Sequence, residues 1–143
     1  MSRRLVVIDT NVFVSALMTN GVCRTILHSW LTADVIEVAM CPYLFDEVTR
    51  VINRPKIRRF ISKELSDALL GTLAVGATWH PDPSRISRMT RDTADDPVVQ
   101  FAYDVGASLL ISGDQDLATL EVARVVRVAD PAHALHIMHE WRS

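Results

Sequence analysis

The sequence predicts an α/β fold in which a parallel β-sheet lies between two layers of helices. One observation behind this prediction is that the strand-like segments, residues 5–8 and 109–111 above all, are continuously apolar, as strands buried on both faces are. The other is that such segments alternate along the chain with segments of helical periodicity. Strands that are buried on both faces and joined through helices are expected to run parallel.

In the first half of the chain, polar residues, prolines and glycines mark the element boundaries. Asp9 stops the first strand and stands as a cap before a helix, and Asp34 separates the second helix from the next strand. Pro42 precedes the third helix, Pro55 limits it, and Gly76 ends the fourth. In chain order these signals predict a strand over residues 5–8, helices over 11–17 and 24–33, a strand over 35–41, and helices over 43–52 and 62–75.

In the second half of the chain, strand-like and helix-like segments alternate again, with a long polar segment among them. Residues 81–95 are polar and rich in arginine and aspartate, which predicts a surface loop. Pro97 suits the first turn of a helix, and Gly106 ends that helix. The segments expected around them are a weak strand over residues 77–80, a helix over 97–105, a strand over 108–112, a turn over 113–117, a strand over 125–128 and a helix from residue 131.

Length and composition predict one domain over residues 1–143. Hydrophobic residues make up 49% of the chain, and there are only 5 glycines and 6 prolines, which argues against disorder. No apolar run is long enough to cross a bilayer, and no small-residue cleavage site follows the basic N-terminus, so we expect a cytoplasmic protein without membrane attachment. Cys23 and Cys41 form no CxxC pair, which favours two small buried hydrophobes over a zinc site or a disulfide.

Charge is balanced in sum but uneven along the chain. The 15 Lys and Arg residues against 17 Asp and Glu residues give a net charge of −2, which is not the footprint of a protein that coats nucleic acid. Cations nevertheless gather at Arg50, Arg54, Lys56, Arg58, Arg59 and Lys63, and acids at Asp92, Asp95, Asp96, Asp114 and Asp116. The pattern predicts a phosphate-attracting patch and a separate cation-attracting site.

Several acids are predicted to meet at one edge of the sheet. Asp9 ends the first strand, Asp114 follows the strand over 108–112, and Asp95 and Asp96 precede the helix before that strand. Ligands of parallel α/β sheets bind outside the carboxyl ends of the strands. Clustered carboxylates need a cation or raised pKa values, and oxygen ligands suit Mg²⁺ or Mn²⁺. Each acid also has a purely structural interpretation, as a helix cap, a turn residue or a solvated helix face.

Taken together, four segments resemble the PIN-domain family of ribonucleases, in particular its bacterial toxin-like branch. The segments are VIDTNVFVSA over residues 7–16, PYLFDE over 42–47, RDTADDPVV over 91–99 and ISGDQDL over 111–117. The resemblance spans nearly the whole chain and implies a three-layer α/β/α domain with a central parallel sheet of four to five strands.

The resemblance also assigns site residues. It implies that Asp9, Glu47, Asp95 and Asp114 are metal-binding and catalytic acids. The spacing back from Ala102 and Ala107 favours Asp95 over Asp96 as the inward carboxylate. The supporting residues it implies are Asn11, Ser112, Asp92, Asp96 and Asp116. Apart from the resemblance, Arg50, Arg54 and Arg58 are candidates for holding RNA phosphates that flank the cleaved bond. The basic run over residues 50–63 could instead contact an acidic antitoxin, and a solvated charged face is the favoured interpretation.

By the same resemblance, the protein is expected to be an endoribonuclease dependent on Mg²⁺ or Mn²⁺, the toxin of a toxin–antitoxin pair bound by a small antitoxin protein, and a homodimer. Two alternatives stay open: a catalytically silent PIN-like binding or regulatory module, and a metal-dependent nuclease that acts on DNA. A phosphatase is disfavoured because the motif Asp9-Thr10-Asn11 lacks a second aspartate. The histidine stripe of the last helix favours a solvent or interface face over a zinc site; it consists of His133, His136 and His139.

Overall fold

A five-stranded parallel sheet forms the centre of the molecule. The computed structural model describes residues 3–83, 96–118, 120–123 and 125–142. The sheet has the strand order β3-β2-β1-β4-β5, and every neighbouring pair is parallel. The strands are β1 (Arg4–Ile8), β2 (Ile36–Met40), β3 (Thr78–Trp79), β4 (Leu109–Ile111) and β5 (Val128–Ala129). The predicted parallel sheet of four to five strands is therefore confirmed.

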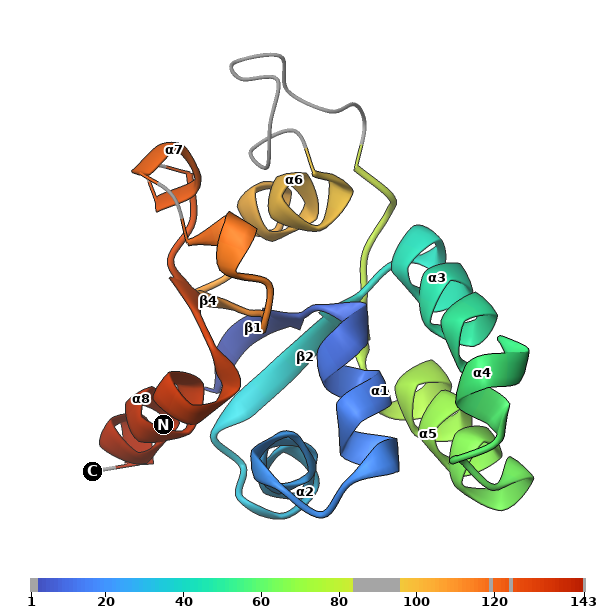
Figure 1. Ribbon diagram of the computed structural model, residues 1–143. Helices are drawn as coiled ribbons and strands as arrows, with labels where there is room; N and C mark the ends of the chain where they lie inside the picture. The colour runs from blue at the N-terminus through green and yellow to red at the C-terminus, as the bar shows by residue number, and fades with distance from the viewer. Residues whose placement is uncertain (1–2, 84–95, 119, 124, 143) are drawn as a thin grey trace.

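Helices cover both faces of the sheet, which confirms the predicted three-layer α/β/α arrangement. In Figure 1, α6 lies on one side of the sheet, α1, α2 and α8 lie on the other, and α3, α4 and α5 form a group beside them. The helices are α1 (Thr10–Met18), α2 (Val22–Thr32), α3 (Pro42–Ile52), α4 (Pro55–Arg58), α5 (Lys63–Gly76), α6 (Pro97–Asp104), α7 (Leu120–Ala123) and α8 (Pro131–Arg142), with a 3-10 turn η2 (Gln115–Leu117).

The structure differs from the sequence prediction mainly in its short helices and strands. Helices α4 and α7 were not predicted, because four residues are too few to show a helical period. The strand expected over 125–128 begins only at Val128, since α7 and the turn after it use the preceding residues. The loop predicted over 81–95 lies, from residue 84 onward, outside the described residues.

The core consists of the two-sided sheet and the apolar faces of its helices. Val6, Val7 and Ile8 of β1 are at most 2% exposed, which explains why this strand is apolar without alternation. Cys41 is buried and Cys23 half-buried, and both are free thiols, as expected of small hydrophobes. Across the described ranges, no helix is long and apolar enough to span a membrane.

The register of β1 against β4 sets the position of the site. Val7 pairs with Leu110 and Ile8 with Ile111, and the backbone N–H of Asp9 donates to the carbonyl of Ile111 at 2.9 Å. The two strands therefore end level, and the next residues, Asp9 and Ser112, leave the sheet side by side.

Candidate functional site

Asp9 and Ser112 form the centre of the candidate site. Ser112 is only 3% exposed, and its hydroxyl donates to Oδ2 of Asp9 at 2.8 Å. The same hydroxyl oxygen accepts the backbone N–H of Asp114 at 3.1 Å. Ser112 thus fixes the carboxylate of Asp9 and the start of the turn that carries Asp114.

Glu47 is held at this edge from a different helix. Thr10, in the first turn of α1, is 4% exposed, and its Oγ1 donates to Oε1 of Glu47 on α3. The sequence left open whether Glu47 turns inward or toward solvent. The bond to a buried hydroxyl shows that Glu47 turns toward α1 and the end of β1.

Asp96 and Asp114 each begin a helical segment at the same edge. The Oδ1 atom of Asp96 accepts the backbone N–H of Val98 at 2.8 Å, so this side chain caps α6. The Oδ1 atom of Asp114 accepts the backbone N–H of Asp116 at 2.9 Å and caps η2. Each capping bond uses one of the two oxygens of its carboxylate.

The four acids interact electrostatically. Burial raises the pKa of Asp9; the hydrogen bond from Ser112 and the backbone of Thr10 lower it, and the negative charges of Asp96 and Glu47 raise it further. Burial likewise raises the pKa of Asp96, the N–H of Val98 lowers it, and Glu47 and Asp114 raise it. Carboxylates from four separate segments therefore crowd one edge of the sheet.

The chemistry of these donors fits a hard divalent cation. All are carboxylate oxygens, which Mg²⁺ and Mn²⁺ prefer, and a cation between them would offset their mutual repulsion. Among the residues that the structure describes, no group of three or more His, Cys, Asp or Glu side chains is arranged to hold a metal ion. Two of the predicted acids, Asp92 and Asp95, lie outside those residues.

The remaining predicted residues have varied positions. Asn11 lies exposed on the first turn of α1. Asp116 is exposed within η2, and its backbone N–H donates to the side chain of Asp114. Asp96, expected only as a supporting residue, faces both Glu47 and Asp114 electrostatically. Thr10 was not predicted, although its place between Asp9 and Asn11 in the N-terminal motif was a usable signal.

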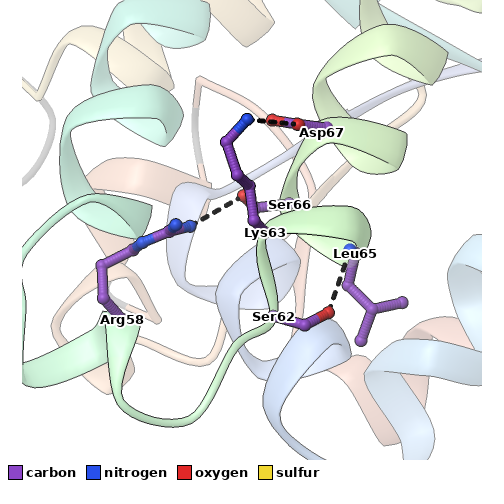
Figure 2. Close-up of polar contacts among 6 residues, drawn as sticks. All are labelled: Arg58, Ser62, Lys63, Leu65, Ser66 and Asp67. Carbon is purple, nitrogen blue, oxygen red and sulfur yellow. Dashed lines mark hydrogen bonds and ion pairs between the residues drawn. The ribbon is translucent and has the colours of Figure 1, made fainter.

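The predicted phosphate-binding arginines differ in their surroundings. Arg50 and Arg54 are exposed at the end of α3. Arg58 is half-buried, and its Nη1 donates to Oγ of Ser66 on α5 at 3.1 Å, as Figure 2 shows. The side chain of Arg58 thus links α4 to α5.

Thiol chemistry does not arise at this edge. Burial raises the pKa of Cys41, at the end of β2, to about 11, so the thiol is protonated at neutral pH. The nearby Oδ1 atom of Asp82 accepts the backbone N–H of Tyr43 at 2.8 Å. Asp82 therefore supports the first turn of α3, the helix that carries Glu47.

Fold and site together define an α/β protein with an acidic group at the carboxyl edge of a parallel sheet. Comparison with known proteins matches residues 5–116 to the PIN domain family, and the chain belongs to that family. It is also 30% identical to the uncharacterized protein MJ1680 of Methanocaldococcus jannaschii over 116 residues, which cover 80% of this chain and 74% of the relative. The predicted family is confirmed. PIN domains have a nuclease fold and are generally metal-dependent hydrolases.

Proposed function

We propose that this protein is a metal-dependent endoribonuclease that hydrolyses RNA phosphodiester bonds. The observation that carries the proposal is the electrostatic coupling of Asp9, Glu47, Asp96 and Asp114 at one sheet edge of a nuclease fold. Four acids from separate segments are unfavourable together unless a cation or bound protons offset their charge.

In this proposal the acids hold Mg²⁺ or Mn²⁺. Asp9, Glu47 and Asp114 are the ligands, with Asp95 or Asp96 completing the set. When bound, such an ion supplies a water with lowered pKa and positive charge at the scissile phosphate. Ser112 orients Asp9 and favours its ionised form, because its hydroxyl donates to the charged carboxylate.

Thr10 holds the carboxylate of Glu47 in place from the first turn of α1. The proposed site needs no cluster of lysines or arginines beside the cleaved bond, which accords with a chain of net charge −2. Arg50 and Arg54 would contact phosphates farther along the strand, because they lie exposed at the far end of the helix that carries Glu47.

The biological role we propose is that of a toxin bound by a small antitoxin protein, with the toxin acting as a homodimer in the cytoplasm. This finer role rests on the resemblance of the four motifs over residues 7–16, 42–47, 91–99 and 111–117, taken together, to the toxin-like branch. The uncharacterized archaeal relative gives no role of its own.

The test is cleavage of end-labelled RNA and of DNA with the same sequence, at saturating Mn²⁺ and in EDTA, with wild-type protein and Asp9→Asn. The proposal expects wild-type protein to produce RNA fragments in Mn²⁺ and none in EDTA. It expects the cleavage rate of Asp9→Asn to be at least about 100-fold lower, a larger loss than substitutions of supporting residues usually cause. Cleavage of DNA alone would identify a DNA nuclease. Intact RNA and DNA at saturating Mn²⁺, with a folded protein, would identify a binding module without turnover.

A further inference from the structure

Cations concentrate on one small part of the molecule. Between Glu47 and Glu64 the chain has no acidic residue and six of its 15 lysines and arginines. The rest of the chain therefore carries nine cations against 17 acids. An anionic partner is repelled by most of this protein and attracted mainly to the end of α3, to α4 and to the start of α5.

Two cations of this segment are engaged within the protein. Arg58 donates to Ser66, and Nζ of Lys63 lies 3.4 Å from Oδ2 of Asp67, as Figure 2 shows. Arg54, Lys56 and Arg59 are exposed, and none of them forms an ion pair with any residue in the described ranges. These three remain available to a partner.

An exposed aromatic ring accompanies these cations. Phe60 is 64% exposed although Ile61, the next residue, is 3% exposed and belongs to the core. The backbone of Arg59 keeps a helical conformation after α4, and the N–H of Phe60 donates to the carbonyl of Ile57 at 2.9 Å. Positions 56, 59 and 60 have the spacing of neighbours on one helical face. Ile57 and Ile61 anchor the segment, so Phe60 stays outside.

The segment is also fixed in orientation. The hydroxyl of Ser62 accepts the backbone N–H of Leu65 at 3.1 Å and caps α5, while Arg58 ties α4 to Ser66 (Figure 2). A surface held in this way loses little conformational entropy when a partner binds.

We propose that Arg54, Lys56, Arg59 and Phe60, the basic α4 surface, bind the part of a single-stranded RNA that extends from the acidic site along α3. The cations would contact backbone phosphates, and a base would stack on Phe60. This proposal rests on the proposed function and specifies how its substrate is held. The exposed ring favours RNA over an acidic protein segment, because every base offers a π-face while a carboxylate does not. Continuity supports it, since α3 leads from Glu47 to Arg54.

The experiment measures binding without cleavage. The 143-residue protein in EDTA is titrated against a labelled single-stranded oligouridine of about 16 nucleotides, the upper end of usual site sizes, over a range of salt concentrations. Lys56→Gln/Arg59→Gln should weaken binding about tenfold and lower the slope of log K against log salt by about 1.4. Phe60→Ala should weaken binding about tenfold, while Phe60→Tyr should preserve it.

The control Arg127→Gln/Arg142→Gln removes the same charge from exposed positions, one of them at the end of α8, which lies far from α4 in Figure 1. It should leave the affinity and slope within twofold of wild type. Equal losses in both double variants, or an affinity in Phe60→Ala equal to wild type, would overturn the proposal. Displacement of the RNA by oligoglutamate at an equal concentration of negative charge would also overturn the proposal. Because EDTA prevents metal-dependent cleavage, loss of binding in the α4 variants supports this surface even if the wild type cleaves no RNA.

Discussion

The hydroxyl of Ser112 donates to Asp9 at 2.8 Å, joining residues 103 positions apart. The bond exists because β1 and β4 are parallel neighbours that end level, with Ile8 paired to Ile111. Its electrostatic effect opposes that of burial. Burial raises the pKa of Asp9, and the Ser112 hydroxyl lowers it, so Ser112 favours the ionised carboxylate that a metal ion requires.

Ser112→Ala should therefore impair activity through Asp9. Loss of the hydroxyl raises the pKa of Asp9 further, so the acid limb of the pH–rate profile should move to higher pH. At neutral pH we expect a loss of about 10- to 100-fold, as for other residues that orient ligands. Unfolding free energy should fall by about 1–3 kcal/mol, because the N–H of Asp114 also loses its acceptor. A reduced rate with an unmoved acid limb would contradict this role for Ser112.

Thr10→Val should act through Glu47. Valine fits the buried position of Thr10 but cannot donate to Oε1 of Glu47. We expect Mn²⁺-dependent cleavage to fall about tenfold, with a stability change of about 1 kcal/mol. Thr10→Ser keeps the hydroxyl and should retain most of the activity. If valine and serine variants cleave equally well, the bond does not position Glu47 for catalysis.

Asp9→Asn should stabilise the metal-free fold at neutral pH. The pKa of Asp9 is raised above its ordinary value of 3.8, so the folded protein binds the proton more tightly than the unfolded chain. Stability therefore falls as pH rises from 3.8 through the folded-state pKa, and above it the ionised carboxylate is a net cost. Asparagine removes this cost and can still accept from Ser112.

Thermal unfolding in EDTA checks this prediction. The melting temperature of Asp9→Asn should exceed that of wild type at pH 7, and the difference should disappear below about pH 3.8. A constant difference at every pH would indicate a packing effect instead of the loss of a charge.

The long, apolar elements were predictable because their pattern records burial directly. Strand β1 is buried on both sides, and its sequence has no alternation. Strand β5 has two residues and helix α4 has four. Both are too short to show the hydrophobic periodicity from which strands and helices are predicted. Their positions depend on the surrounding tertiary structure.

In the candidate site, too, some residues were predictable from the sequence and others depended on the tertiary structure. Asp9 was predictable because it ends an apolar strand, and Asp114 because it follows one. The orientation of Glu47 was not, because it depends on a hydroxyl 37 positions away. Ser112 was assigned by resemblance, and the bond that explains its presence requires the register of β1 against β4.

Asp96 offers a test of metal binding in which capping and charge can be separated. Asp96→Asn keeps an oxygen that can accept from Val98 and removes the charge, whereas Asp96→Ala also removes the cap of α6, which should lower stability by about 1 kcal/mol. In EDTA, Asp96→Asn should melt at or above the wild-type temperature at pH 7, because the raised pKa of Asp96 makes its ionised form unfavourable in the fold.

Saturable Mn²⁺ binding should then raise the wild-type unfolding free energy by about 2.7 kcal/mol at 100 times the Kd. If Asp96 is a ligand, Asp96→Asn should need a higher Mn²⁺ concentration for the same increase, while Asp95→Asn should respond like wild type. The reverse result would make Asp95 the ligand and Asp96 the cap alone. Asp96 can cap α6 and still be a ligand, because the capping bond uses only one of its two oxygens, and its carboxylate lies in the field of Glu47 and Asp114.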